Sequence, residues 1–407
     1  MAIQSSTLYD RAGSISIYLE GLMRYYHRDL MANHAGAVKK QVFGGLSAAL
    51  ALEDGTLIFG KGFGDTGTRS GEVVFSTAMN GYTESMTDPS YVGQILIFTY
   101  PLIGNYGVPP DFESDGIKIE ALVVSSATEP SHPRSRKSLH EWLRESSVPG
   151  IMDVDTRMLV IKTREQGVMG GAVQVAESID EICEEKLLRL AKEVNFDSKV
   201  FEYSSYKEPT TFNEGGKSTI VLVDFGVKSG VIHALASKGY RVVVVPGKMG
   251  SDAIFAYNPK GIVISNGPGN PARMTSAIQL VKEIVESEIP TLGICLGHQL
   301  LSLALGAKTY KLRYGHRGIN KACRDLLTGR RVITLQNHGY AVSAESLENR
   351  GLKPWFVDCD DGTIEGLIHE SLPIISVQFH PEGRPGPRDA FYVFEWFEKL
   401  VKGDGIR

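Results

Sequence analysis

The sequence predicts an α/β protein with two domains, of which the second is a doubly wound parallel sheet. A chain of 407 residues is too long for one ordinary hydrophobic core, so at least two domains are expected. In the second half, near-continuous apolar runs alternate with helical stretches, which is typical of a parallel sheet covered by helices on both faces. In the first half, runs rich in Val, Ile, Phe and Thr lie between turns, which indicates an α/β domain built around strands.

The composition narrows the class of protein. The contents of 42% hydrophobic and 22% charged residues are those of a soluble globular protein. The net charge of −4 gives no reason to expect nucleic acid or an anionic membrane as a partner, and no apolar run approaches the ~20 residues of a membrane-spanning helix. The four cysteines are scattered without a CxxC pair, which argues against a disulfide framework or a zinc knuckle and favours a cytoplasmic location: Cys183, Cys295, Cys323 and Cys359.

The first domain is expected over residues 46–200. Residues 48–64 predict a β-hairpin whose turn lies at Asp54-Gly55, and TDPSY (87–91) has the residues of a turn. Apolar content predicts further strands in 72–82 and 94–105, and apolar spacing predicts helices in 138–146, 156–167 and 179–194.

Two segments lie outside the predicted domains. Residues 1–45 form an N-terminal extension of unknown role, because charged residues interrupt its apolar stretch and no signal or transit peptide is recognisable; Met31 is an alternative start. Residues 201–217 are polar and rich in turn-forming residues, so we interpret them as a linker.

The second domain is expected over residues 218–402. The carboxyl ends of its parallel strands should meet at one edge of the sheet, where the site of a doubly wound fold lies. The predicted strands lie in 218–226, 240–247, 261–269, 289–295 and 375–379, and the helices in 228–239, 274–288 and 300–306.

The stretch GICLGHQ (293–299) places a cysteine at a predicted strand-to-helix junction. The pattern G-x-C-x-G has the form of a nucleophile elbow, in which flanking glycines let neighbouring segments approach a strained turn. The free N–H groups of the following helix can stabilise an anion on the sulfur. The alternative is a buried structural cysteine, which is common for this residue type.

A thiol nucleophile needs a base that a third group orients. FHPEG (379–383) follows a predicted buried strand, which delivers His380 to the same edge as Cys295 and places Glu382 two residues on. His298 is nearer in sequence but points along the new helix, and a surface loop remains the alternative for the His-Glu pair. The N–H of Leu296 and the glycines of SNGPGNP (265–271) can supply oxyanion donors. Together these residues indicate acyl transfer through a thioester.

GICLGHQ, SNGPGNP and FHPEG together resemble the motifs of the class I (triad-type) glutamine amidotransferases, in that family's order and spacing. In the first half, residues 71–107 and 153–167 resemble the small-subunit domain of carbamoyl-phosphate synthetase. The resemblance covers nearly everything after residue 46. It implies a small-subunit α/β domain followed by a doubly wound class I glutamine amidotransferase domain.

Carried over motif by motif, the resemblance implies that Cys295 is the nucleophile, His380 the general base and acid, and Glu382 its orienting partner. Ser90 would reach across the domain interface, although a turn cap is its structural alternative, and Asn337 and His338 could equally be turn residues. The implied glutamine-binding residues are Ser90, Gly267, Gly269, Leu296, Gln299, Asn337, Gly339 and Tyr340.

The implied reaction is hydrolysis of L-glutamine to glutamate and ammonia. The implied partner is a large synthetase subunit that uses the ammonia, with ATP and Mg²⁺, to make carbamoyl phosphate for pyrimidine and arginine synthesis. No metal and no organic cofactor is expected in this chain. Two alternatives stay open: a glutaminase serving another synthase, such as those for anthranilate or GMP, and a non-catalytic assembly or regulatory subunit with a relic site.

Overall fold

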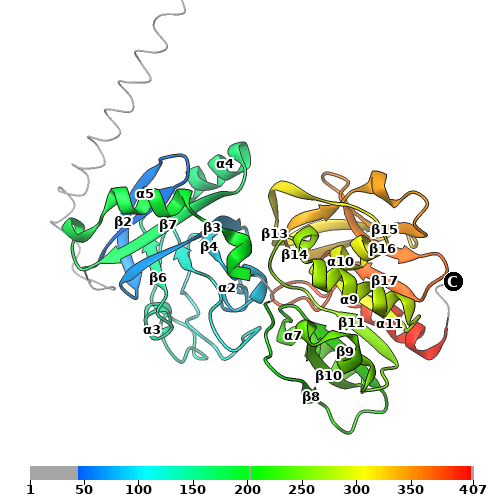
Figure 1. The fold of residues 1–407 in the computed structure, drawn as a ribbon. Coiled ribbons are helices and arrows are strands. Elements are labelled where there is room, and N and C mark those ends of the chain that lie inside the picture. Colours follow the sequence, from blue (N-terminus) through cyan, green and yellow to red (C-terminus); the bar gives the residue numbers. More distant parts are fainter. Residues whose placement is uncertain (1–44, 201–202, 405–407) are drawn as a thin grey trace, which may run out of the picture. The chain divides into compact units, whose positions relative to one another are not determined.

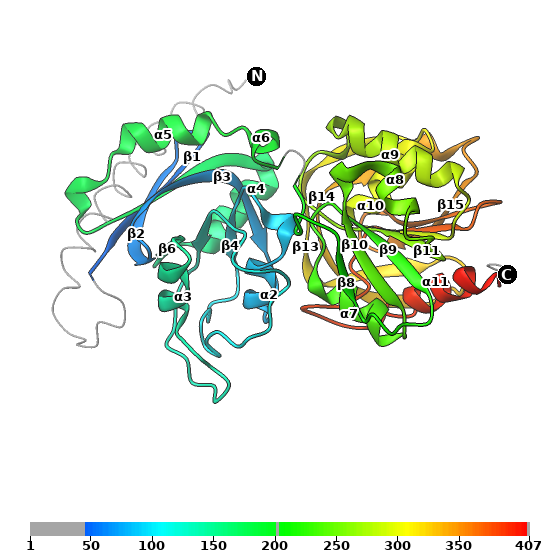
Figure 2. The same cartoon turned by 60° about the horizontal axis from the view of Figure 1, so that its bottom comes forward.

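The computed structural model describes residues 45–200 and 203–404, which belong to one compact unit (Figures 1 and 2). The predicted extension lies outside the described residues, apart from Gly45. Both halves are α/β, as predicted. Within the described residues no helix is long and apolar enough to cross a bilayer.

The strands of the first half close into a barrel in the order β1-β2-β6-β5-β4-β3-β7. The predicted hairpin is confirmed, because β1 and β2 pair antiparallel around the turn at Asp54-Gly55. Closure comes from β7, which pairs antiparallel with both β1 and β3. The strands are β1 (Ser47–Leu52), β2 (Leu57–Gly64), β3 (Gly67–Ser76), β4 (Gln94–Phe98), β5 (Ala121–Val123), β6 (Pro149–Met152) and β7 (Met169–Ala176).

Apolar side chains from all seven strands of the barrel meet in one buried cluster, which is the expected interior of a closed sheet. Side chains with the opposite orientation pack outward against helices, so these strands are apolar on both faces. The helices of this half are α2 (Tyr82–Met86), α3 (Leu139–Glu145), α4 (Thr156–Gln166), α5 (Glu184–Lys192) and α6 (Phe196–Val200).

Local signals set the ends of two of these helices. The Ser138 side chain and Glu141 form a capping box at the start of α3. Asp155 caps α4, which ends at Gly167. The predicted turn TDPSY is a 3₁₀ turn, Pro89–Tyr91, in which the Asp88 carboxylate accepts a hydrogen bond from the Ser90 N–H.

The second half contains one ten-stranded sheet in the order β14-β13-β15-β16-β17-β12-β11-β9-β10-β8. Its centre, from β10 to β17, is parallel, which confirms the doubly wound prediction. The strands are β8 (Thr210–Phe212), β9 (Thr219–Asp224), β10 (Arg241–Pro246), β11 (Gly261–Ile264), β12 (Thr291–Ile294), β13 (Thr309–Asp325), β14 (Arg331–Val342), β15 (Leu352–Asp358), β16 (Ile364–His369) and β17 (Ile374–Val377).

Helices cover both faces of this parallel centre. On β9, Ile220 and Leu222 belong to the core beneath α7 and α11, whereas Val221 and Val223 belong to the core beneath α8, α9 and α10. Because both faces are buried, the strand is continuously apolar rather than alternating. The helices are α7 (Ser229–Ser237), α8 (Gly250–Phe255), α9 (Thr275–Glu286), α10 (Leu296–Ala304) and α11 (Val393–Lys402).

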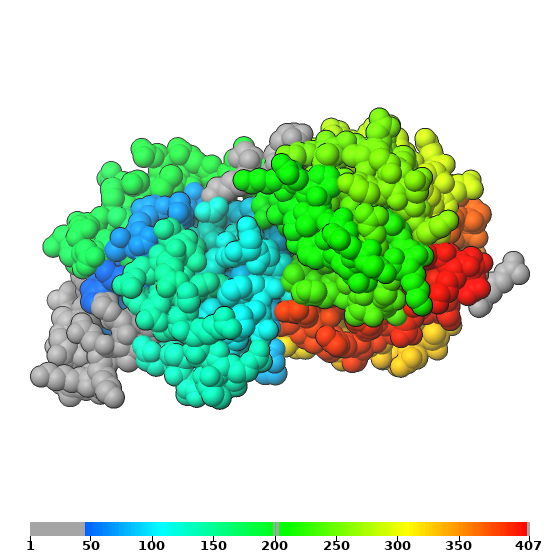
Figure 3. Space-filling view, turned by 90° about the horizontal axis from the view of Figure 1, so that it is seen from below, coloured from blue at the N-terminus to red at the C-terminus, as the bar shows by residue number. Residues whose placement is uncertain are grey.

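Hydrogen bonds join the two halves. Within the predicted linker, β8 adds an antiparallel edge strand to β10, so this segment is part of the second sheet. Across the boundary, the Ser229 N–H donates to the Glu113 carbonyl and the Val168 N–H to the Arg313 carbonyl. Figure 3 shows the atoms of the two halves packed against each other.

Candidate active site

Cys295 lies at the turn between β12 and α10 and adopts a strained backbone conformation, with φ 54° and ψ −103°. The flanking glycines allow the turn to form. A Cβ on Gly297 would lie 2.1 Å from the Ile264 carbonyl oxygen, and one on Gly293 would lie 2.7 Å from the Gly297 oxygen. The pattern G-x-C-x-G therefore has the steric reason that the sequence suggested.

The thiol of Cys295 is almost fully buried. The Cys295 N–H donates to the Val377 carbonyl at 2.8 Å, which fixes the turn against β17. The sulfur lies 3.8 Å from the Asn337 carbonyl oxygen and 3.7 Å from Nε2 of Gln378. The polar neighbours of the sulfur thus come from β14 and from the segment after β17.

His380 and Glu382 follow β17 and are both buried. The His380 N–H donates to the Leu335 carbonyl at 2.9 Å, which ties this segment to β14. Nδ1 of His380 lies 2.9 Å from Oε1 of Glu382. Because a carboxylate only accepts, Nδ1 carries a proton. Nε2 is buried and has no hydrogen-bond partner among the described residues.

Lys228 completes this arrangement, and we call His380, Glu382 and Lys228 the His380 cluster. Nζ of Lys228 lies 2.8 Å from Oε1 of Glu382, and the lysine side chain is fully buried. It also donates to the carbonyl of Arg384. Lys228 is not among the residues predicted from sequence, because a single lysine after an apolar strand has no local signature.

Two cationic groups of the His380 cluster, Lys228 and the imidazole, share the carboxylate of Glu382. Burial and the nearby charge of Lys228 lower the pKa of His380, but the Glu382 carboxylate outweighs them and raises it to about 10. Burial would raise the pKa of Glu382, but Lys228 and the imidazole hold it well below its usual range. The cluster therefore keeps a protonated imidazole beside the sulfur at neutral pH.

A pocket opens in front of the thiol, with a volume of about 480 Å³ including its mouth. All the predicted glutamine-binding residues except Leu296 line it: Ser90, Gly267, Gly269, Gln299, Asn337, Gly339 and Tyr340. Leu296 has a buried side chain and is the first residue of α10, where the backbone N–H has no partner within the helix. The same lining contains charged side chains that no sequence motif predicted: Glu72, Lys311 and Arg317.

Ser90 comes from the first half and is held against the second. Its hydroxyl accepts a hydrogen bond from Nδ2 of Asn266 at 3.2 Å. Nδ2 of Asn337 donates to Asp88, which also caps the turn that carries Ser90. The turn TDPSY thus has a purpose outside its own half, since it presents Ser90 to the pocket.

Two further expectations meet the structure here. Asn337 and His338 lie within strand β14, so they are not turn residues. His298 lies on α10, and its Nδ1 is 2.9 Å from the hydroxyl of Ser376. Burial lowers the pKa of His298 to about 3, so its imidazole is neutral.

Comparison with known proteins decides the family. Residues 221–400 match the family model of class-I glutamine amidotransferases, and residues 50–173 match that of the carbamoyl-phosphate synthase small chain, CPSase domain. The carbamoyl phosphate synthase small chain of Sulfurisphaera tokodaii is 48% identical over 366 residues, covering 88% of this chain and 97% of that protein. The chain belongs to the carbamoyl phosphate synthase small-chain family.

Other members of the family are about as similar. The small chain of Pyrococcus furiosus is 48% identical over 368 residues, covering 87% of this chain and 97% of that protein. Among solved structures, a glutamine amidotransferase from Thermotoga maritima matches 47% of this chain and 86% of its own, with 20% identity and a TM-score of 0.35.

Proposed function

We propose that Cys295, His380 and Glu382 hydrolyse L-glutamine through a γ-glutamyl thioester. As a carbamoyl phosphate synthase small chain, the protein is the glutaminase subunit of that synthase and passes ammonia to the large subunit. The observation that carries the proposal is the buried thiol on a strained elbow, beside an imidazole that a carboxylate orients.

Each group has a task in the proposed reaction. The sulfur of Cys295 attacks the amide carbon of glutamine, and His380 gives a proton to the departing ammonia. Water then attacks the thioester carbon while His380 accepts the proton of that water, and glutamate leaves as the sulfur is released, unprotonated, beside the protonated imidazole. Glu382 holds the imidazole through Nδ1. The N–H of Leu296, at the start of α10, is placed to stabilise the oxyanion.

The pocket lining suits a zwitterionic amino acid. It presents the carboxylate of Glu72, which pairs with Lys311 at 2.7 Å, and the guanidinium of Arg317, so groups of both signs face an α-amino acid in the pocket. The polar residues that we propose to bind glutamine are Ser90, Gln299 and Asn337, together with the backbone of Gly267, Gly269, Gly339 and Tyr340.

The remaining chemistry belongs to the large subunit, which uses ATP, Mg²⁺ and bicarbonate to turn the ammonia into carbamoyl phosphate for pyrimidine and arginine synthesis. We propose that hydrolysis itself needs no metal or organic cofactor in this chain. We also propose a cytoplasmic location, because all four cysteines are free thiols and two of them, Cys183 and Cys359, are exposed.

The decisive experiment is Cys295→Ser in the complex with the large subunit. A serine hydroxyl is a far weaker acid than a thiol, so the glutamine-dependent rate should fall below detection. Because the side chains differ by one atom, the complex should still make carbamoyl phosphate from free ammonia.

Cys359→Ser, a change at an exposed thiol, is the matched control and should keep both activities. An unchanged glutamine-dependent rate in Cys295→Ser would exclude the thioester. Loss of both activities would instead assign the elbow a structural role, as in a non-catalytic subunit.

A further inference from the structure

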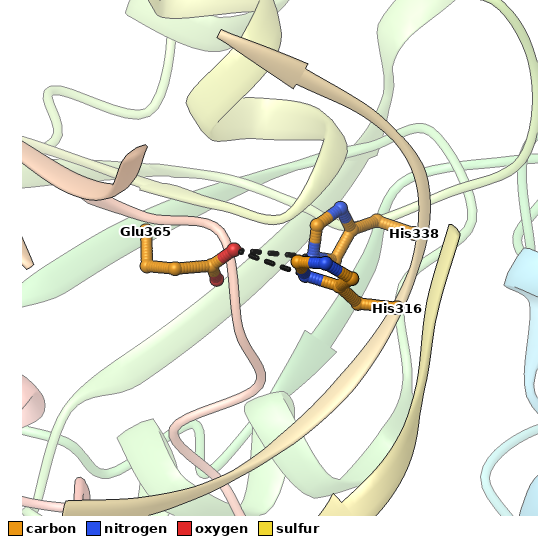
Figure 4. Close-up of side chains that lie close together, drawn as sticks. All are labelled: His316, His338 and Glu365. Carbon is orange, nitrogen blue, oxygen red and sulfur yellow. Dashed lines mark ion pairs between the residues drawn. The ribbon is translucent and has the colours of Figure 1, made fainter. Parts of the chain in front are cut away.

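Three buried side chains meet beside the pocket, each from a different strand, and one of them, His338, is among the residues that line it. His316 comes from β13, His338 from β14 and Glu365 from β16, and both imidazoles point toward the carboxylate (Figure 4). We call them the His316 cluster. The exposed fractions are 5% for His316, 4% for His338 and 0% for Glu365. None of the three takes part in the proposed hydrolysis.

The carboxylate of Glu365 lacks the partners that a buried carboxylate needs. Its Oε1 lies 3.5 Å from Nδ1 of His316 and 3.4 Å from Nε2 of His338, which is longer than a good hydrogen bond. Among the described residues, neither oxygen of Glu365 has a hydrogen-bond partner, nor does Nδ1 of His316. Burying an unpaired carboxylate costs free energy, so we expect a cation to bind in this cluster.

The contacts of the outer ring nitrogens show which nitrogens can bind a cation. Nε2 of His316 lies 2.9 Å from the Asp361 carboxylate, and Nδ1 of His338 lies 2.9 Å from the Tyr340 carbonyl. Nε2 of His338 also lies 3.4 Å from Oε1 of Gln336, as far as it lies from Glu365, so a bound ion would replace that long contact. Both partners only accept, so each outer nitrogen carries the proton and each neutral ring turns a lone pair toward Glu365. Metal-binding histidines are oriented in this way by a carboxylate or a carbonyl.

We propose that Nδ1 of His316, Nε2 of His338 and Oε1 of Glu365 bind one divalent transition-metal ion of the zinc class. Ligand bonds of ~2.0–2.1 Å in a tetrahedron place ligand atoms about 3.3 Å apart, close to the two separations observed. Two imidazole ligands favour such an ion over Mg²⁺ or Ca²⁺, which prefer oxygen. Asp358 is a further acidic side chain near the cluster, since its Oδ2 lies 4.0 Å from Nδ1 of His316, but this oxygen also lies 3.8 Å from Nζ of Lys321, so binding the ion would compete with that ion pair.

The ion has a positioning role. It ties β13, β14 and β16 together beside the pocket, and His338 stands between Asn337 and Gly339 in the lining. From the sequence, no metal is expected in this chain. The sequence could not reveal these ligands, because they are separated by 22 and 27 residues, which is no recognisable metal-binding spacing. The rival occupant is a proton, since burial raises the pKa of Glu365 to about 7 in the absence of a cation.

The test uses the full chain carrying Cys295→Ser, so that the active-site thiol cannot bind metal. After removal of metals with a chelator, the chain is titrated with Co²⁺ and the visible spectrum is recorded. We expect the intense d–d bands of four-coordinate cobalt, saturating at one ion per chain, and their loss when Zn²⁺ is added.

Two variants and one control locate the ion. Glu365→Gln and His316→Asn should each weaken Co²⁺ binding at least tenfold, whereas His233→Asn, at an exposed histidine of α7, should leave it unchanged. Circular dichroism confirms that each variant is folded. X-ray absorption at the zinc edge is measured on the zinc-loaded chain without substitutions in the His316 cluster. It should show two imidazole nitrogens among the atoms that coordinate the zinc.

Three outcomes would overturn the proposal. No bands in the Cys295→Ser chain would leave a proton as the occupant of the cluster. If Glu365→Gln and His316→Asn bind Co²⁺ as tightly as the chain without these substitutions, the bound metal is an adventitious ion only. A first shell of sulfur or of water oxygens alone would place the metal elsewhere. None of these outcomes bears on glutamine hydrolysis.

Discussion

The second half of the molecule buries two clusters of histidine and glutamate. They differ in how the charge of the buried carboxylate is balanced. In the His380 cluster, the imidazole and carboxylate lie 2.9 Å apart and Lys228 adds a buried cation at 2.8 Å. In the His316 cluster, the separations are 3.4–3.5 Å, and no lysine or arginine makes an ion pair with Glu365 among the described residues.

The difference shows in the carboxylates. Lys228 and His380 hold the pKa of Glu382 well below its usual range, whereas burial raises the pKa of Glu365 to about 7. A buried carboxylate stays ionised only where a cation comes with it. Glu382, which we propose orients the catalytic imidazole, has its own cation in the chain, Lys228. In the His316 cluster, the corresponding cation would be a metal ion from solution.

The largest expected effect separates the tasks of the two clusters. His380→Asn removes the group that we propose transfers protons, so the glutamine-dependent rate should fall by at least about 10²–10⁴-fold. His316→Asn should lower it by less than about tenfold. Steady-state assays of the complex with glutamine and with free ammonia measure both variants. Equal losses would show that the clusters act as one unit.

Lys228→Met tests whether the His380 cluster depends on its internal cation. The substitution leaves the carboxylate of Glu382 buried without its lysine, so the free energy of unfolding should fall by about 3–5 kcal/mol. Lys353→Met breaks an exposed pair with Glu370 and should change the free energy of unfolding far less. Urea unfolding followed by circular dichroism compares them. Similar decreases in the free energy of unfolding for the two variants would mean that the buried position of Lys228 adds nothing to stability.

Stability should follow pH as the raised pKa of His380 dictates. The folded state holds this pKa at about 10 against an ordinary value of 6.5, so the contribution is complete below pH 6.5 and is lost as pH rises through 10. The lowered pKa of Glu382 makes its contribution complete above its ordinary value of 4.5 and removes it as pH falls further.

The difference in unfolding temperature between the unaltered chain and His380→Asn should therefore be greatest between pH 4.5 and 6.5 and shrink toward pH 10. Thermal unfolding at a series of pH values measures it. A difference that grows above pH 7 would contradict the assigned protonation of His380.

The smallest effect concerns the pocket in front of the His380 cluster, which a residue of the first half completes. Ser90→Ala removes the hydroxyl that Asn266 contacts, so the KM for glutamine should rise about tenfold, equivalent to one hydrogen bond of roughly 1.4 kcal/mol, while kcat changes little. Ser85→Ala, at a buried serine outside the pocket lining, is the control. Unchanged kinetics in Ser90→Ala would remove Ser90 from substrate binding.

The sequence could predict most of the fold because its elements carry local signals. The apolar runs of the second half become the parallel strands, and the capping box at Ser138 and the stop at Gly167 mark helix ends. The elbow at Cys295 and the His380–Glu382 pair are likewise short patterns, since each is contained in a few consecutive residues.

Only the tertiary structure determined the features that depend on contacts between residues far apart in the sequence. The barrel closes where β1 meets β7, more than a hundred residues on, and no local pattern predicts that closure. Lys228 reaches Glu382 across 154 residues, and the ligands of the His316 cluster come from three strands. A sequence pattern reports the neighbours of a residue along the chain, whereas the charge and burial that give these groups their chemistry come from neighbours in space.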